Sequence, residues 1–132
     1  MKTDEEIKTE LFRFIRSSPL MEAVTGSLSK TKRPKDSILE DVVISIKSNK
    51  NGENQIAYAN VHVYTKGKRV DRQVEEDTTR LTELCRMCAD LFDVFRPVPE
   101  ARCTLNTQRI MAVDGTDEYL INNEIKYRIT NE

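Results

Sequence analysis

Three cysteines and one histidine are the residues of this 132-residue chain that suggest a metal site. Cys85 and Cys88 form a C-x-x-C pair, and with Cys103 and His62 they would supply four ligands of the kinds that zinc prefers. The spacing contains no second ligand pair, and Cys85 and Cys88 fall on the apolar stripe of a predicted helix. A redox C-x-x-C pair belongs at the start of a helix, where the dipole lowers the thiol pKa. We therefore expect buried thiols that act as small apolar groups, with no metal and no cofactor.

The single histidine, His62, is the first residue to consider for catalysis. It lies between Val61 and Val63 in a predicted strand, so its side chain faces away from theirs. A catalytic histidine needs a nucleophile or an acid as its partner, and the chain has no G-x-S-x-G, P-loop or G-x-G-x-x-G motif. Only four glycines are present, which argues against a loop that cradles phosphate. We expect a protein that is not an enzyme.

Two clusters of cations are the strongest charge features of the chain. The first cluster is Lys30, Lys32, Arg33 and Lys35, and the second is Lys66, Lys68, Arg69 and Arg72. Neither is interleaved with aromatic residues, so stacking of single-stranded nucleic acid on them is not indicated. Solvated loops are the simpler interpretation, and the functional alternative is docking to an acidic partner or to DNA phosphates. The net charge of −1 gives no whole-molecule attraction for nucleic acid.

The composition fits one domain that spans residues 1–132. Apolar residues make up 38% of the chain, which is enough for a core at this length. The acidic N-terminus has no apolar stretch, so we expect no signal peptide. No apolar run approaches the roughly 18 residues that a membrane span needs. Three cysteines do not make a disulfide framework, which favours a reducing, cytoplasmic setting.

Hydrophobic periodicity predicts two helices. The first begins at Asp4, a predicted N-cap, and ends near Ser17, because Pro19 disfavours helical geometry in the residue before it. The second and longer helix is predicted from about Asp71 to Phe95, where apolar residues recur at offsets of three, four and seven. Two prolines shortly afterwards mark its end.

Period-two alternation predicts four strands in two hairpins. Asp41–Ser48 and Gln55–Thr65 flank an Asn-Gly pair, which is a strong turn signal. Thr104–Val113 and a last strand through residues 119–129 flank an Asp-Gly turn, and a short strand is expected near Leu28. The order α-β-β-α-β-β predicts an α+β fold. In this fold an antiparallel sheet of about four to five strands carries two helices on one face.

The region around the first basic cluster resembles part of the small tail-completion proteins of phages and prophages, also called tail terminators. In that family an N-terminal helix is followed by a glycine, a short strand, an Arg-Pro element and a long strand. The matching stretches here are Gly26-Ser27-Leu28, Arg33-Pro34-Lys35-Asp36-Ser37 and Glu40-Asp41-Val42-Val43-Ile44. The segment Ala59-Asn60-Val61-His62-Val63-Tyr64 resembles the second long strand of the family. The later helix and the closing hairpin agree in order.

This resemblance implies a structural protein that assembles into a homo-oligomeric ring, typically a hexamer, which caps the tail tube and meets the head connector. Such a protein would assemble in the bacterial cytoplasm and become part of the virion. A lumen that conducts DNA would give the two basic clusters a role, although contact with DNA is not required. The family assigns no residue of the clusters, so their choice as partner-binding sites depends on charge alone.

Two other hypotheses stay open. A small bacterial binding or adaptor module would use the basic loops to contact an acidic protein or nucleic acid. Its binding would depend on salt and on Lys66, Lys68 and Arg69. A small enzyme that uses His62 or the cysteines ranks last, because no set of nucleophile, base and orienting residue is visible.

Overall fold

The computed structural model describes residues 1–130, so residues 131–132 of the predicted domain lie outside the described part. The helices of residues 1–130 are α1 (Asp4–Arg16), α2 (Pro19–Ala23) and α3 (Thr78–Leu91). The strands are β1 (Leu28–Ser29), β2 (Val42–Lys50), β3 (Asn54–Lys66), β4 (Lys68–Val70), β5 (Gln73–Glu75), β6 (Val94–Phe95), β7 (Ala101–Ala112) and β8 (Glu118–Thr130).

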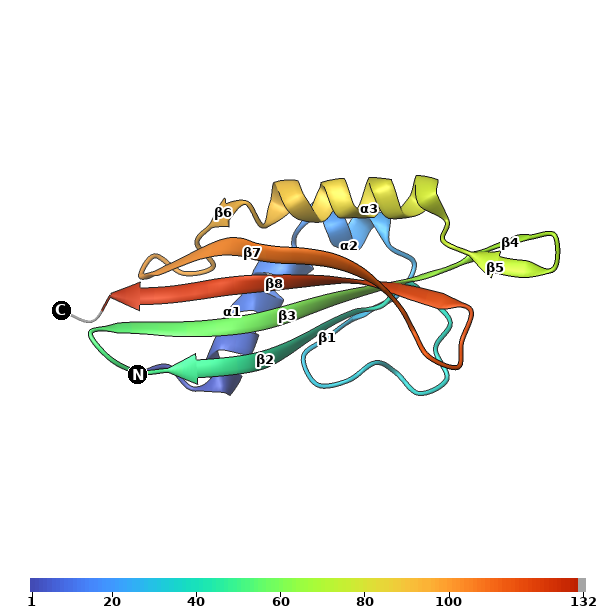
Figure 1. Ribbon diagram of the computed structural model, residues 1–132. Helices are drawn as coiled ribbons and strands as arrows, with labels where there is room; N and C mark the ends of the chain where they lie inside the picture. Colours follow the sequence, from blue (N-terminus) through green and yellow to red (C-terminus); the bar gives the residue numbers. More distant parts are fainter. Residues whose placement is uncertain (131–132) are drawn as a thin grey trace.

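Six of these strands form one sheet, in the order β1-β2-β3-β8-β7-β6. β1 is parallel to β2 and every other neighbouring pair is antiparallel, so the sheet is mixed. The central strands β3 and β8 pair over their whole lengths. β4 and β5 form a separate hairpin that projects from one end of the body (Figure 1).

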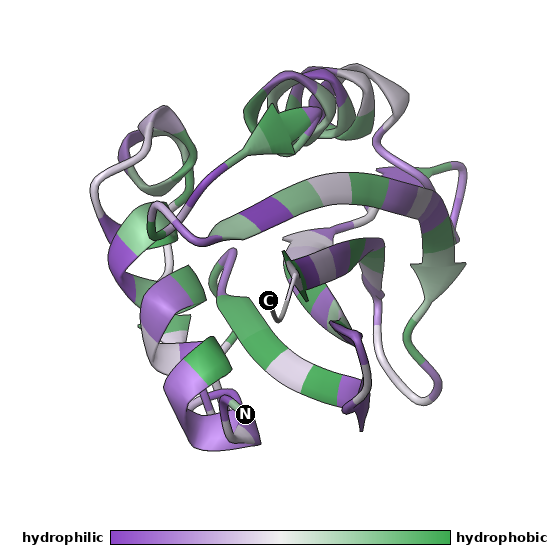
Figure 2. Cartoon of the chain, turned by 90° about the vertical axis from the view of Figure 1, so that its left-hand side faces the viewer, coloured by the Kyte–Doolittle hydropathy of each residue, from purple (hydrophilic) through white to green (hydrophobic). Residues whose placement is uncertain are grey.

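The two faces of the sheet differ because side chains alternate along each strand. In β3 the odd-numbered residues from Gln55 to Thr65 are buried, and their even-numbered neighbours are half-buried. The buried side chains meet α1 and α3 in a core that includes Leu11, Leu84 and Tyr127. Figure 2 views the molecule from one end and shows the curled sheet with both long helices on the same side. The opposite face, called the open face below, carries no helix from residues 1–130.

Helix α1 is capped by Thr3 and not by Asp4, which corrects the predicted N-cap by one residue. Thr3 Oγ1 accepts a hydrogen bond from the Glu6 N–H (3.2 Å), and Glu6 Oε1 accepts one from the Thr3 N–H (3.0 Å). This capping box satisfies two N–H groups that the helix leaves free. Just before it, the buried Gln55 side chain on β3 accepts from the Lys2 N–H and donates to the Lys2 carbonyl. The start of the chain is therefore held against the central strand.

The first part of the helix predicted over residues 71–95 is a hairpin instead. Residues 68–75 form β4 and β5, with Asp71 and Arg72 between the two strands. These two residues have positive φ values of 47° and 71°, which a tight hairpin turn requires and a helix forbids. Val74, which fits the helical period in the sequence, lies against Gly67 at the base of the hairpin. A Cβ atom on that glycine would come within 2.5 Å of Val74 Cγ1.

The helix itself occupies a shorter range, Thr78–Leu91. Its N-cap is Asp77, whose side chain accepts a hydrogen bond from the Arg80 N–H (3.2 Å). Its C-cap is Phe92, and the chain then turns into the two-residue strand β6. The N-cap aspartate defines the start of the helix better than the apolar period does, because the period continues by chance into the hairpin.

The α+β class and the order α-β-β-α-β-β of the long elements are confirmed, as is the short strand near Leu28. The detailed prediction of an antiparallel sheet with four to five strands and two helices is only partly right. The sheet of residues 1–130 has six strands and one parallel pair, and α2 adds a third helix. The strand of this sheet that the sequence did not predict is β6, whose two residues are too few for a period to be read. No helix among residues 1–130 is long and apolar enough to cross a membrane.

Candidate functional site

Arg33, a member of the first basic cluster, is held by two carboxylates of its own chain. Its Nε donates to Asp41 Oδ2 (2.8 Å), and Nη1 and Nη2 donate to the two carboxylate oxygens of Glu118 (2.9 and 2.6 Å). The guanidinium also lies over the Tyr64 ring, 4.2 Å from its centroid. Lysine could not reproduce this bidentate and stacked geometry. Arg33 therefore joins the loop before β2 to the start of β8, and its charge is compensated within the chain.

The other cations of the first cluster differ in their surroundings. Lys30 Nζ donates to Thr9 Oγ1 on α1 (3.0 Å), which holds this lysine against the helix. Lys32 and Lys35 are exposed, and neither forms an ion pair within residues 1–130. Only these two residues of the cluster present exposed charges without a partner in the described part of the chain.

The second basic cluster lies on the projecting hairpin, which we call the basic arm (residues 66–75). Its four cations are all exposed: Lys66, Lys68, Arg69 and Arg72. Within residues 1–130 the only ion pair of these four is a long one, between Arg69 Nη2 and Asp117 Oδ2 (4.0 Å). The base of the arm borders a cavity of about 550 Å³, whose wall includes the exposed side chain of Ile38. Among the described residues, the cations of the arm would therefore lose at most this one long ion pair on contact with a partner.

The three cysteines do not form a metal site. Cys85 is half-buried, whereas Cys88 and Cys103 are buried, and all three are free thiols. No group of three or more His, Cys, Asp or Glu side chains within residues 1–130 is arranged to hold a metal ion. Burial raises the pKa of the Cys88 thiol and that of the Cys103 thiol to about 12. Such thiols are almost fully protonated at neutral pH and are therefore poor nucleophiles.

We expect the three thiols to react at different rates with an aromatic disulfide reagent. In the native protein at about pH 8 the reagent should modify Cys85 first, because Cys88 and Cys103 are buried and protonated. Full reaction should require guanidinium. A colorimetric thiol titration with and without denaturant measures this, and equal rates for all three thiols in the native protein would contradict the described burial.

The register of the sheet brings residues that are distant in the sequence together on the open face. Four cross-strand rows run from β2 through β3 and β8 to β7. In order they are Val43, His62, Asn122 and Arg109; Ser45, Asn60, Glu124 and Thr107; Ser48, Tyr58, Lys126 and Thr104; and Lys50, Ile56, Arg128 and Arg102. We call these four rows, together with Lys47 at the bulge of β2, the basic face.

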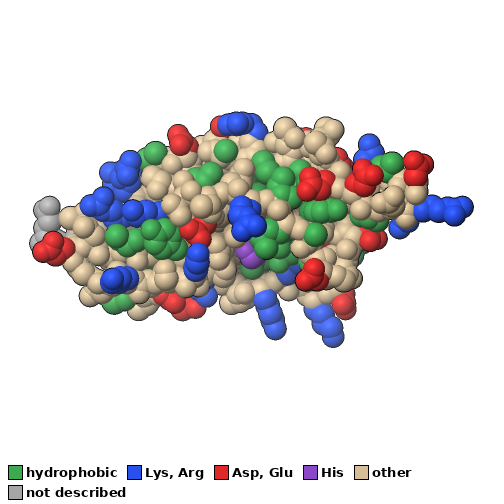
Figure 3. Space-filling model, viewed as in Figure 1, with side chains coloured by type: hydrophobic (Ala, Val, Ile, Leu, Met, Phe, Trp, Pro, Cys, Tyr) green, Lys and Arg blue, Asp and Glu red, His purple; other side chains and the backbone are tan. Residues whose placement is uncertain are grey.

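The basic face carries six cations and a single carboxylate. That carboxylate, Glu124, pairs with Lys47 (2.8 Å). The other five cations have no carboxylate partner within residues 1–130: Lys50, Arg102, Arg109, Lys126 and Arg128. The face thus has a surplus of five positive charges in a chain of net charge −1, so the remainder of the chain has a surplus of six negative charges. Figure 3 shows this side of the molecule, with basic side chains near the purple histidine.

Two side-chain oxygen atoms in the middle of the basic face lack a hydrogen-bond donor. Asn60 Oδ1 and Asn122 Oδ1 are buried, and neither accepts a hydrogen bond. His62 lies beside Asn122 in the first row, and burial lowers the pKa of its imidazole, so that the ring is neutral at pH 7. Buried amide oxygens are nearly always satisfied in folded proteins. These two atoms are exceptions, and with less than 1 Å² of exposed area each they are out of reach of a molecule on this face.

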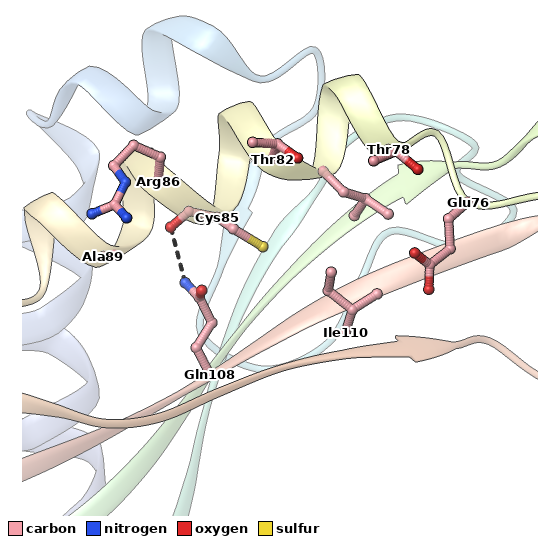
Figure 4. A pocket seen from close by; sticks show the side chains of 9 residues that line it. Glu76, Thr78, Thr82, Cys85, Arg86, Ala89, Gln108 and Ile110 are labelled. Carbon is pink, nitrogen blue, oxygen red and sulfur yellow. Dashed lines mark hydrogen bonds between the residues drawn. The ribbon is translucent and has the colours of Figure 1, made fainter.

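The outer edge of β7 is a second uncovered feature. β6 pairs only with Cys103 and Thr104, and further along β7 the side chains of Ile110 and Met111 are 40% and 41% exposed. A groove of about 280 Å³ lies between this edge and α3. Figure 4 shows the hydrogen bond from Gln108 Nε2 to the Cys85 carbonyl (3.0 Å) that crosses it. An open strand edge with apolar side chains is a site where a further strand can pair.

No model of a known protein family matches the chain, and no curated protein matches it either. The features that remain as candidates are the basic arm, the basic face and the edge of β7. The arm contains the second basic cluster that the sequence predicts as a partner site. The basic face was missed, although the alternation of residues 126 and 128 within a predicted strand was an available signal.

Proposed function

We propose that this protein is a structural tail-completion component of a phage or prophage, which assembles with copies of itself and docks to the tail tube or the head connector. The observation that carries this proposal is the pair of uncovered strand edges at opposite sides of the sheet. On one side the outer edge of β7 has no neighbouring strand beyond Thr104 within residues 1–130. On the other side β1 covers only Val42 and Val43, which leaves the rest of β2 open.

The directions of the two edge strands favour a ring. β2 and β7 are separated by β3 and β8 in an antiparallel arrangement, so they run in opposite directions. Copies related by rotation about an axis along the strands would therefore bring β7 of one copy beside β2 of the next in antiparallel orientation. Such a heterologous contact closes into a ring when the rotation angle between neighbouring copies is a whole-number fraction of a full turn. The bulge between Ile46 and Ser48 would restrict this pairing to part of β2.

The basic arm supports the docking part of the proposal. It projects beyond the sheet and carries four exposed cations, so it suits contact with an acidic surface on a neighbouring component (Figure 1). Since the sequence resembles tail-completion proteins, we propose that this neighbouring component is the tail tube or the head connector. This protein acts without catalysis, by surface complementarity alone.

A binding or adaptor module is the second candidate function, and the charge on the basic arm favours it. Such a module would bind its partner as a monomer. Its affinity would fall as salt rises and as Lys68 and Arg69 are replaced. The oligomeric state of the purified protein separates the two candidates.

The proposed assembly predicts a concentration-dependent oligomer. Size-exclusion chromatography with light scattering should give a mass that is a multiple of the 15.2 kDa chain. The Ile110→Arg variant should shift the equilibrium to the monomer, because it places a charge on the apolar part of the β7 edge. Ile38→Arg, at an exposed isoleucine away from that edge, is the matched control and should leave the mass unchanged. A monomer at every concentration tested would overturn the proposed function.

A further inference from the structure

We propose that the basic face binds single-stranded nucleic acid, with phosphates on its cations and bases stacked against Tyr58. This goes beyond the proposed tail-completion function and does not depend on ring formation. It concerns residues other than the two basic clusters of the sequence. The four rows of the open face carry the inference, because one uncovered surface combines an aromatic ring with five cations that have no carboxylate partner within residues 1–130.

The outermost row contains two arginines that face each other. Arg102 and Arg128 are direct cross-strand partners. Like charges in such positions destabilise a sheet. The only side-chain hydrogen bond of the two within residues 1–130 is a long one from Arg128 Nη2 to Asn54 Oδ1 (3.4 Å). Lys126, one row further in, also lacks a carboxylate partner in the described part. An anion seated between these three side chains would remove the repulsion, which identifies this end of the face as a phosphate site.

Aromatic and apolar side chains lie among these cations. Tyr58 on the central strand β3 is opposite Lys126, and Ile56 is opposite Arg128. Tyr58 is half-buried, so its ring is held by the sheet while part of it stays accessible. Proteins that bind single strands combine a positively charged surface with rings on which bases stack. An antiparallel sheet with helices on one side and aromatic residues on its open face is a common platform for unpaired bases.

The accessible part of the Tyr58 ring favours a single strand over the alternatives. Unpaired bases expose their faces for stacking on an aromatic side chain, whereas the stacked bases of a duplex do not. A duplex would present mainly its phosphates to this face. An acidic protein segment would pair with the cations but would not need the ring of Tyr58.

Fluorescence anisotropy of a labelled oligothymidylate of about 20 nucleotides tests the proposal. We expect binding at low salt that weakens steeply as salt rises. The Arg102→Ala/Arg128→Ala variant should weaken binding about tenfold or more and should remain folded, because it removes two like charges that face each other. Tyr58→Leu, which keeps apolar bulk on the strand but removes the ring, should also weaken binding about tenfold.

The Lys32→Ala/Lys35→Ala variant is the matched control, because it removes two exposed cations from a loop outside the basic face. It should bind the oligonucleotide like the wild type. Thermal unfolding of each variant shows that a loss of binding is not a loss of fold. The proposal is overturned if the wild type does not bind at low salt, or if a duplex of the same length binds as tightly. The proposal is also overturned if polyglutamate displaces the labelled oligonucleotide as well as unlabelled oligonucleotide does and Tyr58→Leu has no effect on binding. That result would identify an acidic protein as the partner.

Discussion

Replacing Arg33 with methionine should destabilise the protein by about 3–5 kcal/mol, which is the usual cost of removing one partner from a buried ion pair. The Asp41 side chain is 1% exposed, and that of Glu118 is 11% exposed. Without the guanidinium both carboxylates would keep their burial and lose their main counter-charge. The loop before β2 would also lose its connection to β8. Urea unfolding followed by circular dichroism measures the change, and Lys32→Met, at an exposed site of the same loop, should shift the unfolding free energy by less than about 0.5 kcal/mol.

The same cluster makes this effect depend on pH. Burial alone would raise the pKa of Asp41, but hydrogen bonds from Ser37 and Ser27 and the Arg33 guanidinium hold that pKa below its ordinary value. A carboxyl with a lowered pKa stabilises the fold above its unfolded-state pKa of about 3.9, and this contribution is lost as the pH falls. The difference in unfolding free energy between wild type and Arg33→Met should therefore narrow between about pH 5 and pH 3. A difference that stays constant over this range would contradict the assignment of Asp41 as one of the two carboxylates that Arg33 neutralises.

Phe92→Ala should cost a similar amount, about 3–5 kcal/mol, because it opens a cavity in the core. Phe92 is completely buried and its ring centroid lies 5.6 Å from that of Phe95. Phe95 in turn stacks on Phe14 of α1 with centroids 4.4 Å apart. The three rings connect the end of α3 to α1. The truncation should therefore weaken the packing of α3 against α1. Helix α3 also forms one wall of the groove beside β7.

Val94→Ala is the control for this prediction, since Val94 is two residues away but 56% exposed. It should change the unfolding free energy by less than about 0.5 kcal/mol. Thermal unfolding of both variants under identical conditions makes the comparison. Equal and small shifts for the two would mean that the ring cluster contributes little to the packing of α3.

The long elements were predictable because their signals are local. β3 alternates between buried and less buried residues along its length, and β8 does so from Ile121 to Thr130. In β2 the apolar residues Val42, Val43 and Ile44 are all buried, so its sequence period does not appear in its burial. The hairpin of β4 and β5 was not predictable in the same way. Its strands have three residues each, which is too short for a period to be read. Its turn places Asp71 and Arg72 at positive φ, and an Asp-Arg pair is not a turn signal in a sequence.

The surroundings of the charged residues depend on contacts that no local pattern records. Arg33 looks like one cation of a solvated loop, yet its bidentate partner Glu118 is 85 positions away. The cations of the basic face lie on β2, β7 and β8, and only the register of the sheet places Arg102 opposite Arg128. The exposed cations of the basic arm were predictable, because a run of lysines and arginines next to a glycine is polar in any fold.

The most direct test of the central claim, ring assembly through the edges of the sheet, is negative-stain electron microscopy of the concentrated protein. The proposal predicts class averages that show closed rings with a central channel, and predicts that these rings disappear in the Ile110→Arg variant while Ile38→Arg retains them. Isolated monomers or twofold dimers in the wild type, with no closed ring at any concentration, would contradict it.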